Sequence, residues 1–252
     1  MSLILTYINR FGILHASDSN LSAPGQAVVE GKKVFPIDFL CAGLSVAGTY
    51  SVDGKEMHNW MEEFINEQKD NNISTLKEFT EILKYKLQGS LRKNEFKAGC
   101  MMQISGYSET KGIIHPELWF LRNVHSINME TGQYENIDET IEISEDFASR
   151  DLLNNTTLEN YNLKEHETDY SYFNGFAPGR ISYYYLSNSL DDFFKNVWSN
   201  EKWKFRPPSN LNDYKLLANS YMVTIDALFQ LSDDYGRVIG GTPQFHLIPA
   251  PN

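Results

Sequence analysis

The stretch GILHASDS, Gly12–Ser19, decides how the chain begins to fold. It opens with apolar residues and closes with small polar residues around one carboxylate, Asp18. Residues 3–9, LILTYIN, are also rich in β-branched and aromatic types, and Arg10–Gly12 forms a short connection between the two runs. The sequence therefore predicts an antiparallel hairpin at the chain start, whose second strand ends at a carboxylate.

The rest of the chain changes its hydrophobic period several times. Alternating or continuous apolar runs predict strands at 33–37, 39–48, 100–108, 117–127 (with Pro116 in the turn before it) and 238–248. Helical spacing of apolar residues predicts helices around 57–65, 74–89, 190–199 and 211–231. Because strands and helices do not alternate regularly, the order favours an α+β fold in which two antiparallel sheets pack together with helices outside.

The length of 252 residues is enough for one large domain or two small ones. Residues 128–175 differ from the rest because they are polar, acidic and rich in Asn and Glu, with only short apolar pieces. We interpret 1–252 as a single domain that carries a partly ordered polar insertion at 128–175.

The composition excludes several classes of protein. A net charge of −11 disfavours nucleic-acid binding, which needs clustered Lys and Arg, and it gives no support for binding to an anionic membrane. No apolar run approaches the ~20 residues of a membrane helix, and no signal peptide is recognised, so we expect a cytoplasmic protein. Cys41 and Cys100 lie in apolar runs and are predicted to be buried free thiols, and the six scattered histidines give little support for a metal site.

Ser2 is the first candidate for chemistry. Removal of Met1, which is common before a small residue, would give Ser2 a free α-amine with a pKa of about 7.7–8.0 beside its own hydroxyl. Such an amine can act as the base that activates the hydroxyl as a nucleophile. Lys33 is a candidate to lower the pKa of this amine through its positive charge, and Asp18 is a candidate to hold Lys33 in place. The backbone N–H of Gly48 is a candidate to stabilise an oxyanion.

The first 65 residues resemble the catalytic β-subunits of the proteasome, within the N-terminal nucleophile hydrolases. GILHASDS matches the pattern G-[VI]-[VIL]-x-A-x-D-S of that family, and Asp18 follows Ser2 by sixteen residues, as in the family. Lys33, followed by Val34 and Phe35, matches the active-site lysine after a one-residue deletion. GLSVAGT matches the buried strand and small-residue turn with one extra residue, which places Gly48 at the oxyanion glycine.

The resemblance implies a four-layer αββα sandwich and the cleavage of a peptide or amide bond by a Ser2 nucleophile. It also implies that Ser22 and Tyr50 contact the substrate backbone, that no metal or cofactor is required, and that the chain forms a homo-oligomeric ring or stack. The substrate implied is a peptide, or a small amide as in other branches of the superfamily. The Asp and Ser that steady the N-terminal amine in that family are not assigned to residues of this chain.

Each of these residues also has an ordinary structural interpretation. Asp18 and Ser19 are residues that commonly form turns after a strand. Taken by themselves, Lys33 is most often a solvated surface charge and Gly48 a glycine in a turn. A non-catalytic scaffold or binding subunit that keeps the fold is therefore the alternative function. His15 faces away from Asp18 by strand parity and is predicted to be a packed or partly exposed histidine.

Overall fold

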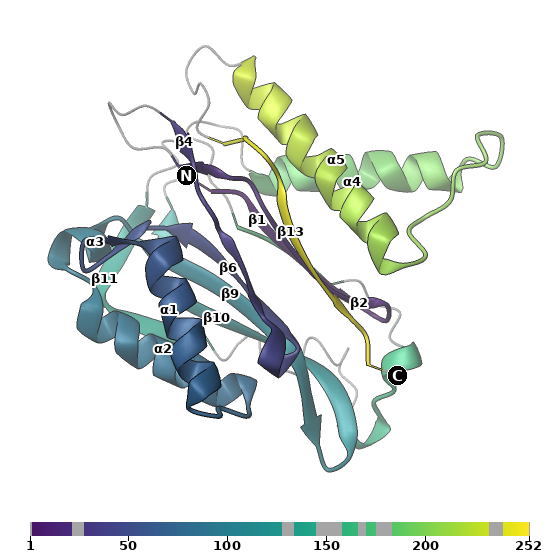
Figure 1. Cartoon of the computed structure of the whole chain (residues 1–252). Helices are drawn as coiled ribbons and strands as arrows, with labels where there is room; N and C mark the ends of the chain where they lie inside the picture. Colours follow the sequence, from purple (N-terminus) through teal and green to yellow (C-terminus); the bar gives the residue numbers. More distant parts are fainter. Residues whose placement is uncertain are drawn as a thin grey trace.

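The computed structural model describes residues 2–21, 28–127, 134–144, 158–165, 170–174, 183–231 and 239–251 (Figure 1). The strands are β1 (Ile4–Asn9), β2 (Gly12–Ser17), β3 (Asn20–Leu21), β4 (Val29–Glu30), β5 (Val34–Ile37), β6 (Ala42–Gly48), β7 (Ser51–Val52), β8 (Lys55–Glu56), β9 (Cys100–Thr110), β10 (Ile113–Ile127), β11 (Tyr134–Ser144), β12 (Tyr170–Asn174) and β13 (Gln244–Pro249). The helices are α1 (Met57–Asp70), α2 (Leu76–Ser90), α3 (Lys93–Lys97), α4 (Tyr183–Ser199) and α5 (Leu211–Gln230), with short 3-10 turns at Asp38–Leu40, Leu158–Asn160 and Leu163–Glu165. The expected mixed α+β class is confirmed.

Two antiparallel sheets form the centre of the described structure. One has four strands in the order β12-β1-β2-β13, and the other has five in the order β11-β10-β9-β6-β5. The predicted hairpin is confirmed, because β1 and β2 pair in register from Ile4 with Ser17 to Asn9 with Gly12. In Figure 1, α1 and α2 lie beside the five-stranded sheet, whereas α4 and α5 lie beside the four-stranded sheet.

Strands β1 and β2 are buried along their whole length because both of their faces are covered. Leu5 and Leu14 pack in one apolar cluster with residues of α5, including Ala218 and Ile225. The neighbouring positions point the other way, since successive side chains of a strand lie on opposite faces. Ile4, for example, packs in a cluster with residues of the five-stranded sheet, including Ala47 and Met101 from β6 and β9.

The five-stranded sheet shows the same alternation. Leu44 and Val46 of β6 belong to the largest apolar cluster, which includes Met61 and Phe64 of α1 and Leu83 of α2. The residues between them on β6 face the four-stranded sheet instead. The two helices therefore cover one face of this sheet and the hairpin strands cover the other. Within the described helices, none has both the length and the apolar composition needed to cross a bilayer.

A polar layer lies between the sheets, around a fully buried His15. Its Nδ1 is 3.0 Å from Ser45 Oγ on β6, and its Nε2 is 2.6 Å from Ser105 Oγ on β9. Gly43 makes room for this layer, because a Cβ there would lie 2.7 Å from ring carbons of both His15 and His246. Burial is the main reason why the pKa of His15 falls to about 3, with the nearby His246 as a second cause.

Three predicted strand boundaries were wrong. The strand expected at 238–248 begins only at Gln244, since residues 239–243 do not form a strand. The strand expected at 39–48 begins only at Ala42, because residues 38–40 form a 3-10 turn that ends at Cys41 in the left-handed conformation, with φ of 47°. This turn leaves the Cys41 thiol exposed, so the prediction of a buried thiol holds for Cys100 alone. Pro116 lies inside β10, opposite Tyr107 of β9, and the turn between these strands comes earlier, at residues 111–112.

The polar segment 128–175 is more closely integrated into the fold than expected. Its residues 134–144 form β11 at the edge of the five-stranded sheet, and residues 170–174 form β12 at the edge of the four-stranded sheet. An edge strand is paired on one side only, and charged residues on it oppose unwanted pairing. This explains why the acidic sequence ENIDETIE lies within a strand.

We predict that His15 makes the protein less stable as pH falls from about 6.5 towards 3. Its folded-state pKa is depressed, so below about 6.5 the unfolded chain takes up a proton that the folded chain does not. The His15 contribution should lower the unfolding free energy by about 1.4 kcal/mol per pH unit in this range. Urea unfolding of the native chain and of His15→Gln at pH 7, 6 and 5 measures this difference. Equal pH slopes for the two proteins would contradict the prediction.

Candidate functional site

Ser2 and Asp18 lie together at one end of the hairpin. Ser2 lies two residues before the start of β1, and Asp18 immediately follows β2, so the register that pairs Ile4 with Ser17 brings both to the same end. The Leu3 N–H donates to Asp18 Oδ1 over 2.8 Å, and the Asp18 N–H donates to the Leu3 carbonyl over 3.0 Å. Ser2 is 5% exposed and Asp18 is 2% exposed, so the cluster is shielded from solvent.

Lys33 joins this cluster from the other sheet. It directly precedes β5, and its Nζ donates to Asp18 Oδ1 over 2.9 Å and to the Asn20 carbonyl over 2.6 Å. One carboxylate oxygen therefore accepts from both the Lys33 ammonium and the backbone N–H that follows Ser2. Lys33 is only 1% exposed, so the interpretation of this residue as a solvated surface charge is wrong.

Burial acts on both members of this ion pair. Loss of hydration lowers the pKa of the Lys33 ammonium below its ordinary value, although the adjacent Asp18 carboxylate opposes that shift. The same loss raises the pKa of the Asp18 carboxyl, and it is opposed by Lys33 and by the hydrogen bond from Leu3. Burial therefore opposes the charged form of each group, and the contact between the two groups favours it.

A second group of contacts, which sequence reasoning missed, fixes the backbone around Lys33. The Gln244 side chain on β13 accepts from the Lys33 N–H over 2.8 Å and donates to the Gly31 carbonyl over 2.6 Å. The Gly240 N–H lies 3.4 Å from Asp18 Oδ2 on the other side of the carboxylate. No local pattern could have shown these contacts, because they depend on β13 pairing with β2.

Gly48 ends β6, the strand that pairs with β5 beside Lys33. The Lys33 carbonyl accepts from the Val46 N–H over 2.9 Å, so Gly48 lies two residues beyond that contact on the same strand. Gly48 has φ of 95°, and a Cβ there would lie 2.2 Å from the Gly99 carbonyl oxygen. Both observations require glycine at this position, whatever the role of its N–H.

The two weaker candidates have different outcomes. Ser22 lies outside the described residues. Tyr50 lies two residues after Gly48, but both its hydroxyl and its carbonyl have partners within the chain. The hydroxyl donates to the Lys32 carbonyl over 2.8 Å, and the carbonyl accepts from the Met57 N–H over 2.9 Å.

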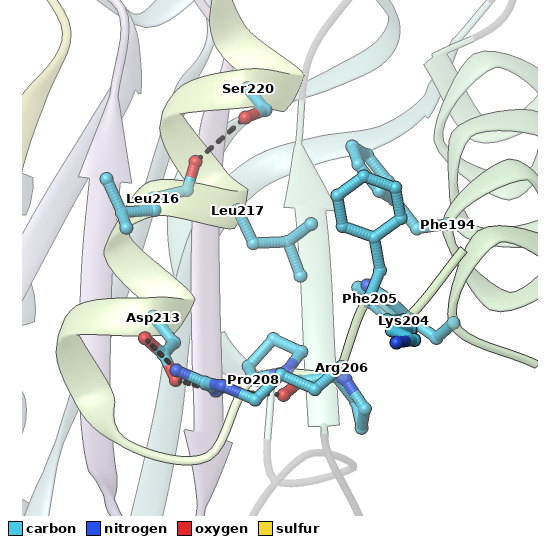
Figure 2. Close-up of a pocket in the computed structure, with 11 residues that line it drawn as sticks. Phe194, Lys204, Phe205, Arg206, Pro208, Asp213, Leu216, Leu217 and Ser220 are labelled. Atoms are coloured by element: carbon cyan, nitrogen blue, oxygen red, sulfur yellow. Dashed lines mark hydrogen bonds and ion pairs between the residues drawn. The ribbon is translucent and has the colours of Figure 1, made fainter. Parts of the chain in front are cut away.

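Two surface pockets in the described part of the chain lie away from this cluster, and none of Ser2, Asp18, Lys33 and Gly48 lines either of them. One, of about 360 Å³, lies between α4, α5 and the segment that connects them (Figure 2). Figure 2 shows the aromatic rings of Phe194 and Phe205 on one side of it and the Arg206–Asp213 ion pair below. The other pocket has a volume of about 530 Å³. It is bounded by the 3-10 turn at Asp38–Leu40, the start of α2, the β9–β10 hairpin and the end of β13.

We predict that removing either partner of the buried ion pair is strongly destabilising. Lys33→Met leaves the Asp18 carboxylate buried without its cation, and a loss of about 3–5 kcal/mol in unfolding free energy is expected. The double variant Lys33→Met/Asp18→Asn should lose less than the two single variants together, since it leaves no unpaired charge. Urea unfolding of the four proteins measures this coupling. Strictly additive losses would show that the pair is not coupled.

The comparisons with known proteins add no family assignment. No protein-family model matches the chain, and no curated protein matches it. The resemblance to proteasome β-subunits therefore rests on the sequence near the N-terminus alone. The functional interpretation has to be argued from the contacts that these residues make.

Proposed function

We propose that the protein is a proteasome-like N-terminal nucleophile hydrolase that cleaves a peptide or amide bond. The observation that carries this proposal is the shared oxygen of Asp18, which accepts from Lys33 Nζ and from the Leu3 N–H. A lysine buried beside the residue that follows Ser2 has a clear use if Ser2 is the reacting group. The same lysine would be a costly choice for stability alone.

In the proposed reaction, Ser2 Oγ attacks the carbonyl carbon of the scissile bond. The free α-amine of Ser2 takes the hydroxyl proton and later gives it to the leaving amine. Lys33 lowers the pKa of that amine through its positive charge, and Asp18 holds Lys33 in place. The Gly48 N–H donates to the oxyanion, and water then hydrolyses the Ser2 ester to release the acyl product.

We also propose that the layers correspond to the αββα sandwich of that family. The apolar clusters support this arrangement: α5 packs on one face of the four-stranded sheet, and α1 and α2 pack on one face of the five-stranded sheet. The remaining faces of the two sheets contact each other through residues such as Ile4 and Met101. A homo-oligomeric ring or stack is part of the same proposal. Exposed apolar side chains such as Leu216 and Val223 on α5 would suit a subunit interface.

A non-catalytic scaffold or binding subunit is the second candidate function. The observation that favours it is that Ser2 lines neither described pocket. A hydrolase needs the Ser2 hydroxyl to reach a substrate, whereas a scaffold needs only the fold. The state of the N-terminus in the native host separates the two candidates.

The first experiment is intact mass spectrometry of the protein purified from its native host. The hydrolase proposal predicts a chain that lacks Met1, because only then does Ser2 carry a free amine. A chain that retains Met1 in its native host would remove the proposed base and leave the scaffold as the function.

The second experiment measures turnover of a panel of fluorogenic peptide amides by the processed protein. Ser2→Ala should reduce turnover by at least about a thousandfold, the order expected when a nucleophile is removed. Ser199→Ala, at the end of α4, is the matched control and should retain full activity. Thermal unfolding of each variant verifies that it is folded. Turnover that survives in Ser2→Ala would remove Ser2 from its role, and a processed native chain inactive on every amide would favour the scaffold.

A further inference from the structure

The pairing of β10 with β11 is interrupted by a large bulge. Arg122 lies opposite Glu142, and Val124 lies opposite Ile137. Between these pairs β10 has only Asn123, whereas β11 has residues 138–141. A bulge of this kind bends its strand and re-aims the side chains on it. Here Asp138 lies within the bulge, so its side chain does not follow the regular alternation of side chains between the two faces of β11.

A buried amide holds the start of this bulge. Asn123 is fully buried, and its Nδ2 donates to the Asp138 carbonyl over 2.9 Å and to the Phe96 carbonyl over 2.9 Å. Its Oδ1 accepts from the Cys100 N–H over 2.6 Å. All hydrogen-bonding groups of this side chain are therefore used, and the backbone at Asp138 is fixed to the body of the sheet.

A second amide holds the rest of the bulge. Gln88 Nε2 on α2 donates to the Glu139 carbonyl over 2.8 Å, and Gln88 Oε1 accepts from the Ile141 N–H over 2.7 Å. The Ile141 side chain is 1% exposed and packs in the cluster below α2. The bulge is thus clamped from both sides, which is how a protein preorganises side chains for binding.

The clamped bulge brings three metal-ligating side chains together. One ligand atom each from His125 on β10 and from Asp138 and Glu142 on β11 lie within 4.8 Å of one another. His125 Nε2 is 3.0 Å from Asp138 Oδ2. Yet this nitrogen is shielded from solvent and has no hydrogen-bond partner in the described part of the chain. The 3.0 Å contact with Asp138 Oδ2 therefore does not have the geometry of a hydrogen bond.

The charges around these residues favour a cation. Asp138 and Glu142 place two carboxylates at one spot on a chain of net charge −11. Lys93 contacts Glu139 of this strand, at 3.5 Å. Arg122 lies opposite Glu142 in register, but its guanidinium lies over the Phe120 ring, 5.7 Å from the ring centre.

We propose that His125, Asp138 and Glu142 bind one divalent transition-metal ion, best matched by Zn²⁺. An imidazole nitrogen with carboxylate oxygens is a ligand set that suits Zn²⁺, whereas Mg²⁺ and Ca²⁺ prefer oxygen ligands alone. The 3.0 Å between His125 Nε2 and Asp138 Oδ2 is close to the roughly 3.3 Å expected between two ligands of a tetrahedral ion with bonds of about 2.0 Å. Asp138 is more than half exposed, so solvent can supply the fourth ligand.

The experiment is isothermal titration of the full chain, freed of metal by a chelator, with zinc chloride. One Zn²⁺ should bind per chain, and Mg²⁺ at the same concentration should give no saturable binding. His125→Gln and Asp138→Asn should each weaken Zn²⁺ binding by at least about tenfold. Changing a residue that only supports a metal ligand already lowers metal affinity by about tenfold or more, and these variants remove a ligand itself. Glu139→Gln is the matched control, because Glu139 adjoins Asp138 but contributes no ligand atom. Its zinc affinity should equal that of the native chain.

Several outcomes would overturn the proposal. These are the absence of saturable zinc binding to the native chain, unchanged zinc binding in His125→Gln, and equal losses of affinity in Glu139→Gln and Asp138→Asn. The last result would indicate a diffuse acidic surface rather than a site. Circular dichroism of the metal-free variants verifies that they are folded, and Glu142→Gln replaces any variant that is not. The visible absorption of bound Co²⁺, lost in His125→Gln, would provide a second measure of the same ligands.

Discussion

The ion pair between Asp18 and Lys33 is the constraint on which the arrangement of the two sheets depends. Each ion loses several kcal/mol of hydration when it is buried, so neither is tolerated there without the other. Asp18 belongs to the hairpin of the four-stranded sheet, whereas Lys33 leads into β5 of the five-stranded sheet. The pair therefore ties the sheets together at one end, and the chain terminus is held beside it through Leu3.

The polar layer around His15 imposes a second constraint on the same interface. Apolar side chains such as Ile4 and Ile13 would tolerate small shifts of one sheet over the other. The His15 ring does not, because both of its nitrogens face hydroxyl groups of β6 and β9. A shift of either sheet would leave these buried groups without partners, at a cost greater than that of a poor apolar contact. The polar groups thus determine how the sheets are aligned.

The sequence predicted those parts of the fold that depend on local periodicity. The hairpin could be predicted because both faces of β1 and β2 are buried, which requires apolar residues along both strands. The main helices could be predicted because one face of each packs on a sheet and carries apolar residues at helical spacing. The sequence also predicted that Asp18 and Lys33 would meet, although only through the resemblance to a family. It could not predict β11 and β12, because edge strands need few apolar residues, and their identity depends on the neighbouring strand rather than on their own pattern.

The other differences have the same origin in distant contacts. Pro116 lies within β10 because that strand extends further than its own pattern indicates and pairs with β9, where Pro116 lies opposite Tyr107. Cys41 is exposed because a 3-10 turn interrupts an apolar run. The cluster of His125 with Asp138 and Glu142 had no recognisable spacing, since a bulge on a second strand brings its members together.

Gln244 has a consequence for how the protein matures. Its contacts to Gly31 and Lys33 join segments that are more than two hundred residues apart in the chain. During synthesis, the N-terminal hairpin leaves the ribosome long before β13 exists to complete its sheet. The buried lysine is then held by an unfinished structure, and its final surroundings form only when the last strand arrives. The surroundings of Lys33 are therefore completed only at the end of synthesis. Contacts between residues so far apart in the chain also favour slow folding.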